Sequence, residues 1–190
     1  MKYTLQFRIW HWLNALVVLG LLATFFLRKT FLSWKTNSEI IVTKLADIGV
    51  EITSQQAAVI AKAIRAGMWE WHIIFGYALA FLMIYRIVLF FFDSSKKESF
   101  SSLDIHHKMV RISYYVVYAT LFVMSVSGLA IHFYQEIGIS KEFAHDIKEM
   151  HELLAYVLVY FTPLHIIGVF VAENRGERGL VSTMISGKEN

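Results

Sequence analysis

Four histidines lie within or at the edge of strongly apolar stretches of this 190-residue chain: His11, His72, His151 and His165. Imidazole is a common metal ligand, and an ionisable group inside a membrane span is costly unless it has a functional partner. His151 and His165 share one apolar run, residues 150–172, and are fourteen positions apart. Fourteen helical steps return to nearly the same face, about 40° away, and advance about 21 Å. One helix face therefore presents an imidazole near each side of a membrane.

The composition is that of an integral membrane protein. Apolar residues make up 56% of the chain and aromatic residues 15%, which is more than a soluble domain of this length can bury. A net charge of only +3 disfavours nucleic acid as a partner and is better explained by loops that face membrane lipid. The absence of cysteine excludes disulfides, iron-sulfur clusters, thiolate zinc sites and covalently attached haem.

Four apolar stretches are long enough to cross a bilayer as helices. The expected spans are about residues 9–27, 69–92, 110–134 and 150–172. The first is expected to be a retained span rather than a signal peptide, because it is long and no cleavage site follows it. We predict an all-α fold, an integral membrane four-helix bundle formed as a single domain over residues 1–190. Four spans place both termini on one side of the membrane, here called side A, with side B opposite.

The connector between the first two spans, residues 28–68, is too long for a simple turn. It holds a capping box at residues 53–56, apolar residues at the helical spacing 57, 60, 61 and 64, and Gly67 as a stop signal. These features predict an amphipathic surface helix between spans one and two. A second, short interfacial helix is expected near residues 180–185.

The alternating direction of the spans sorts the four histidines by depth. His72 begins span two and His151 begins span four, both near side B, whereas His11 and His165 lie near side A. Helix bundles build cofactor sites from side chains on facing helices. Two imidazoles on opposite faces of a porphyrin produce a six-coordinate haem that transfers electrons. The depth pairs therefore favour two non-covalent, bis-histidine haem b groups.

Several further residues bear on this hypothesis. Gly76 and Gly168 follow His72 and His165 by four and three positions, where a bare backbone admits a flat ring. Arg8 and Arg86 are candidates for contact with haem propionates or a quinone oxygen, although snorkelling to lipid phosphate explains them equally well.

The remaining histidines are less informative. His132, near side B, is a candidate fifth ligand, with local hydrogen bonding or a propionate contact favoured over ligation. The neighbouring His106 and His107 are expected to be solvated, because adjacent residues face different directions on a helix. Zinc transport is the competing chemistry, but carboxylates at the same depth are lacking in the first three spans apart from Glu70 at an edge.

The sequence resembles the bacterial cytochrome b561 family over nearly its whole length. The resemblance rests on RIWHW in span one, on WEWHIIFGYALAFLMIYRI in span two, and on HE, HIIG and the terminal GLVSTMISG in and after span four. That family includes the di-haem membrane subunits of nickel-iron hydrogenases and formate dehydrogenases. The resemblance implies ligation by His72 with His151 and by His11 with His165. It also implies that side A is the cytoplasm, with a quinone site near the side A haem.

These observations predict a multi-pass cytochrome of the bacterial inner membrane. It would transfer electrons between quinone and a periplasmic redox protein such as a hydrogenase, a dehydrogenase or a cytochrome c, as an electron-transfer subunit. Two alternatives remain open at this stage. One is a stand-alone superoxide:quinone oxidoreductase, and the other is a histidine-based metal transporter without haem.

Overall fold

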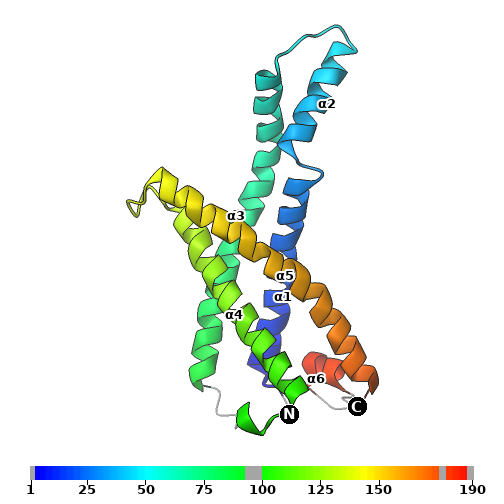
Figure 1. The fold of residues 1–190 in the computed structure, drawn as a ribbon, viewed down its shortest axis with the longest axis vertical. Helices are drawn as coiled ribbons and strands as arrows, with labels where there is room; N and C mark the ends of the chain where they lie inside the picture. Colours follow the sequence, from blue (N-terminus) through cyan, green and yellow to red (C-terminus); the bar gives the residue numbers. More distant parts are fainter. Residues whose placement is uncertain (1–2, 93–99, 176–178, 188–190) are drawn as a thin grey trace. The chain divides into compact units, whose positions relative to one another are not determined.

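A computed structural model of the chain describes residues 3–92, 100–175 and 179–187, and the regular secondary structure of these ranges is entirely helical. In chain order the helices are α1 Leu5–Lys29, α2 Trp34–Ala46, α3 Ser54–Phe92, the short 3-10 helix η1 Phe100–Ser102, α4 Ile105–His132, α5 Lys141–Arg175 and α6 Leu180–Ser186 (Figure 1).

Four of these helices, α1, α3, α4 and α5, are long and apolar enough to cross a membrane. The predicted spans 9–27, 69–92 and 150–172 lie wholly within α1, α3 and α5, and the predicted span 110–134 passes the end of α4 by two residues. Only 11% to 22% of the most apolar window of each helix is buried, so most of its apolar side chains are left to face lipid. The predicted all-α, four-span membrane fold is confirmed.

The chain forms two compact units, one of residues 17–76 and one of residues 1–16 with 77–190. In the first, α2 runs beside the beginning of α3 (Figure 1), where the Lys62 ammonium lies 4.9 Å from the centre of the Trp34 ring. Ala57 and Ala61 on α3 are 0% exposed, because their small side chains permit close packing. Helix α2 was not predicted from the sequence.

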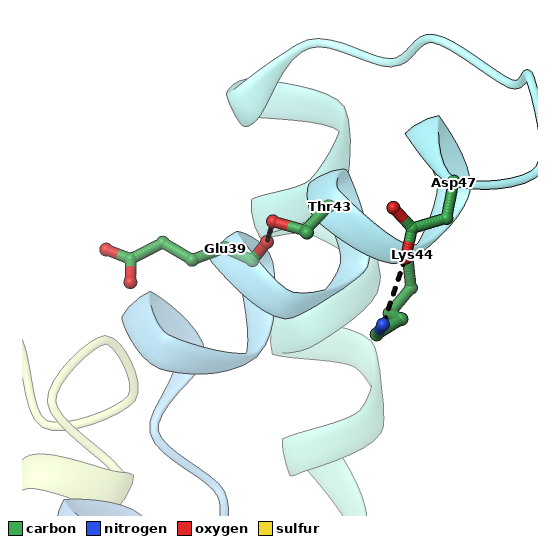
Figure 2. A network of polar contacts seen from close by, with 4 residues as sticks. All are labelled: Glu39, Thr43, Lys44 and Asp47. Carbon is green, nitrogen blue, oxygen red and sulfur yellow. Dashed lines mark hydrogen bonds and ion pairs between the residues drawn. The ribbon is translucent and has the colours of Figure 1, made fainter.

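The outer surface of α2 is stabilised by local polar contacts (Figure 2). The Thr43 hydroxyl donates to the Glu39 carbonyl oxygen at 2.9 Å, and the Lys44 ammonium lies 2.9 Å from the Asp47 carboxylate at the end of the helix. Both side chains of this ion pair are largely exposed. Exposed ion pairs of this kind contribute little to stability.

The segment predicted as a surface helix is helical, but it is the beginning of α3 and not a separate helix. The capping box is present, with the Thr53 N–H donating to Gln56 Oε1 at 2.8 Å and the Gln56 N–H donating to Thr53 Oγ1 at 3.2 Å. The prediction of a stop at Gly67 is wrong, because α3 continues through it as one helix of 39 residues. A helix of that length spans about 58 Å, roughly twice the hydrocarbon thickness of a bilayer. The beginning of α3 therefore extends outside the membrane.

In the second unit, α4 and α5 pack against each other. Asp104 caps α4 by accepting the His107 N–H at 3.2 Å, and the side-chain hydrogen bond from His107 holds the pKa of this carboxyl below its usual value. Helix α5 remains helical through Pro163. Its later, orange part nevertheless runs in a different direction from its first, yellow part (Figure 1), as the lost backbone hydrogen bond predicts.

The short helix α6 forms where it was predicted and is held at both ends. The Glu173 carboxylate, from the end of α5, accepts the N–H groups of Gly179 at 2.8 Å and Val181 at 3.0 Å. At the other end the Arg8 guanidinium donates to the Ile185 carbonyl oxygen at 3.1 Å. An anion at the beginning of a helix and a cation at its end both complement the helix dipole. Helix α6 is therefore tied to α5 and to the first turn of α1.

Candidate functional site

His11 and His165 lie together in the unit of residues 1–16 and 77–190. Their ring centroids are 6.2 Å apart and the ring planes are inclined by 64°. His11 comes from the beginning of α1 and His165 from the later half of α5, so two helices remote in sequence contribute one imidazole each. The structure thus brings together one of the two pairs that the depth argument predicted.

The neighbours of His11 in sequence fix its helix turn. The buried Trp10 donates its indole N–H to the Leu82 carbonyl oxygen of α3 at 2.8 Å. Trp12 donates its indole N–H to the Met184 carbonyl oxygen of α6 at 3.2 Å. These two hydrogen bonds join the residues before and after His11 to two different helices. The position of His11 is therefore set by α3 and α6.

Aromatic rings hold His165. Phe161, one turn earlier on α5, is stacked on its imidazole with a centroid separation of 5.4 Å and an interplanar angle of 14°. Tyr114 of α4 contacts the same ring edge-on at 6.1 Å. Among the residues that the structure describes, neither His11 nor His165 has a hydrogen bond. The unprotonated ring nitrogen of each therefore has its lone pair available for a ligand.

His151 lies against α4 in the same unit. Its Nδ1 is 2.8 Å from the Ser127 hydroxyl oxygen. A side chain on the next residue, Gly128, would place its Cβ only 3.4 Å from His151 Cε1. The absence of a side chain at Gly128 therefore lets the imidazole lie close to the α4 backbone.

His72 has a matching arrangement in the unit of residues 17–76. Its Nδ1 is 2.8 Å from the hydroxyl oxygen of Thr24 on α1. Trp69 contacts the imidazole edge-on at 5.4 Å, and the Arg28 guanidinium lies 5.6 Å from the centre of the Trp69 ring. Hydroxyl and indole contacts from two helices thus hold His72.

The two arginines lie among different groups. Arg8 is 9% exposed and bonded to the end of α6, as described above. The Arg86 guanidinium lies 5.1 Å from the ring centre of Phe7 and 5.3 Å from those of Trp10 and Tyr118. The Nε atom of each arginine is buried and has no hydrogen-bond partner in the described part of the chain. Both arginines therefore retain a donor for an acceptor oxygen.

The other predicted site residues are placed less tightly. A Cβ added at Gly76 or Gly168 would meet nothing within 4 Å, so both leave open space beside their helices. His132 is exposed and lies edge-on to Tyr77 at 5.8 Å. The predicted exposure of His106 and His107 is confirmed, in the first turn of α4.

Residues 3–92, 100–175 and 179–187 contain no group of three or more metal-ligating His, Cys, Asp or Glu side chains.

Thr24 and Ser127 were not predicted from the sequence. Hydroxyl groups in membrane helices usually bond to the carbonyl of the preceding turn, so neither residue stands out along the chain. The available signal was depth, because Thr24 lies near the side B end of span one and Ser127 near the side B end of span three. Both are therefore level with the side B histidines.

A family model described as prokaryotic cytochrome b561 matches residues 2–187. The match covers all four spanning helices, α6 and the four histidines described above. No curated protein and no solved structure matches the chain.

Proposed function

The chain belongs to the prokaryotic cytochrome b561 family, and from that premise we propose that it conducts electrons across the membrane through two b haems, each held by two histidines. Family membership and the four spanning helices make the protein a multi-pass bacterial membrane cytochrome that transfers electrons through haem b. We propose, beyond this, how many haems the chain binds, which residues hold them, and what the electron donor and acceptor are.

The observation that carries the proposal is the separation of His11 and His165. If two imidazoles held one iron between them, each through a bond of about 2 Å, their ring centroids would lie roughly 6 Å apart. The observed 6.2 Å fits that requirement. The free nitrogens of both rings fit it too, since a ligand nitrogen needs an unshared lone pair. His11 and His165 would hold the side A haem.

His72 and His151 would hold the side B haem. Two observations support this pairing. The sequence places both histidines at equal depth in their spans, and each has a hydroxyl oxygen 2.8 Å from Nδ1. An imidazole oriented through Nδ1 in this way would bind iron through Nε2. Open space at Gly76, one turn after His72, is compatible with a flat ring beside α3.

We propose that electrons pass between a redox protein on the outer side, side B, and quinone near the cytoplasmic side A. The haems supply reversible one-electron chemistry; the residues of the chain hold and orient them and exclude water. The buried Nε donors of Arg8 and Arg86 suit a propionate or quinone oxygen near side A. Moving one electron across the membrane is worth about 2.3 kcal/mol per 100 mV, so this path couples redox chemistry to the membrane potential.

The test is haem content in single variants. Changing His11, His72, His151 or His165 to alanine is expected to lower haem from two to one per chain, because a bis-histidine site loses half of its ligands. Exogenous imidazole should restore the lost haem by replacing the missing side chain. His132→Ala is the matched control and should retain two. Retention of both haems in every one of the four variants would refute the ligand assignment.

A further inference from the structure

The two side B histidines share a feature that the side A histidines lack. His72 and His151 each place Nδ1 2.8 Å from a hydroxyl oxygen, supplied by Thr24 and by Ser127. The two contacts form separately, since Thr24 and His72 belong to the unit of residues 17–76 and the other two residues to the second unit. The same hydroxyl–imidazole contact therefore occurs twice in one chain.

Each hydroxyl also has a backbone acceptor in its own helix. Thr24 donates to the Leu21 carbonyl oxygen at 2.7 Å, and Ser127 donates to the Val123 carbonyl oxygen at 2.7 Å. A hydroxyl has one hydrogen and two acceptor lone pairs. With its hydrogen donated to the carbonyl, each hydroxyl oxygen can accept a hydrogen bond from an Nδ1–H. This pairing matches a ligand that binds iron through Nε2, because a neutral imidazole that uses the Nε2 lone pair carries its hydrogen on Nδ1.

Close helix packing supports both contacts. Gly20 lies one turn before Thr24, and a Cβ there would stand only 2.8 Å from the Phe75 ring. Phe75 in turn lies three residues after His72, so α1 and α3 approach closely along this stripe. Gly128, next to Ser127, lies against the His151 ring, and an added Cβ there would stand 3.4 Å from Cε1. A glycine therefore lies near each of the two hydroxyl contacts.

We propose that Thr24 and Ser127 are positioning residues that fix the tautomer of the side B ligands. Each hydroxyl holds its imidazole with the proton on Nδ1, presents Nε2 to iron and makes the ligand more basic. A more basic ligand favours ferric iron, so the two hydroxyls lower the reduction potential of the side B haem. The inference rests on the proposed function, because it requires that His72 and His151 bind the same haem.

The test is a redox titration of the purified cytochrome and its variants. Thr24→Val and Ser127→Ala remove one acceptor each with little change in volume. Each is expected to raise one of the two haem potentials and to leave the other unchanged, and the haem that moves should be the same in both. Haem affinity should fall by roughly 10- to 100-fold, as for other lost ligand-orienting bonds. Thr24→Ser and Ser127→Thr, which retain the hydroxyl, should keep the original potential.

Ser125→Ala is the matched control. Ser125 is buried on α4, two residues before Ser127, and its hydroxyl donates to the Leu121 carbonyl oxygen at 2.8 Å. No potential should move in this variant. The inference is overturned if neither potential moves in Thr24→Val and Ser127→Ala, if the two variants move different haems, or if Ser125→Ala gives the same shift. Failure of the proposed function is seen separately, as fewer than two haems in the unaltered protein.

Discussion

The hydroxyl groups of the spans differ in what they contact besides their own helix. Ser125 and Thr162 each donate to a carbonyl oxygen of the preceding turn, which is usual in membrane helices. Thr24 and Ser127 do the same and also lie against an imidazole of another helix. The second contact, which crosses between helices, is what gives these two residues a role beyond their own turn.

Arg86 offers a residue-scale prediction. Three aromatic rings surround its guanidinium, and its buried Nε has no partner in the described residues. If Nε donates to quinone, Arg86→Met should raise the quinone KM roughly tenfold or more, since a hydrogen bond to a charged group contributes about 1.5–3 kcal/mol. Steady-state quinone reduction measures this, and Arg175→Met, an exposed arginine at the end of α5, is the control. An unchanged KM would remove Arg86 from the quinone site.

At the scale of elements, the sequence predicted the four spans but not their extensions. A glycine inside a helix costs only about 1 kcal/mol, which the backbone bonds and packing of a continuous α3 exceed, so Gly67 does not end the helix. Helix α2 was missed because its apolar residues occupy a short stretch between polar ones. The depths of His11 and His165 could be predicted because helical rise and span direction fix them. The contacts of Thr24 and Ser127 could not, because they depend on how neighbouring helices rotate about their axes.

Two glycines give opposite predictions for the same substitution. Gly67→Ala should raise the free energy of unfolding by about 0.5–1 kcal/mol, because Gly67 lies within α3 and nothing stands within 4 Å of the added Cβ. Gly20→Ala should lower it by about 1–3 kcal/mol, because the added Cβ would stand 2.8 Å from the Phe75 ring. Thermal unfolding in detergent measures both. A loss of stability in Gly67→Ala would indicate that α3 bends at this residue.

The attachment of α6 can be tested through Glu173. The Glu173→Ala variant leaves the N–H groups of Gly179 and Val181 without their carboxylate acceptor, so residues 180–186 should exchange their amide hydrogens faster. Hydrogen exchange followed by mass spectrometry measures this region directly. Glu142→Ala, an exposed change in the first turn of α5, should leave the exchange of α6 unaltered. Equal exchange in both variants would mean that the carboxylate does not hold α6.

At the scale of the whole molecule, four spans place the connector before α3 and the segment before α4 on opposite sides of the membrane. The chain has no cysteine, so single cysteines report accessibility without background. Glu51→Cys should react with a membrane-impermeant maleimide in intact cells. Ser102→Cys should react only after the membrane is opened, if side A is the cytoplasm. The reverse pattern would invert the proposed orientation and place the quinone site on the outer side.

The most direct test of the two proposed haem sites is a reduced-minus-oxidised visible spectrum of the purified protein, with haem quantified per chain as the pyridine complex. The separation of His11 and His165, 6.2 Å between ring centroids, and the second histidine pair at equal depth predict b-type bands and two haems per chain. A single haem per chain, or none, would contradict the central claim that the four histidines form two haem sites.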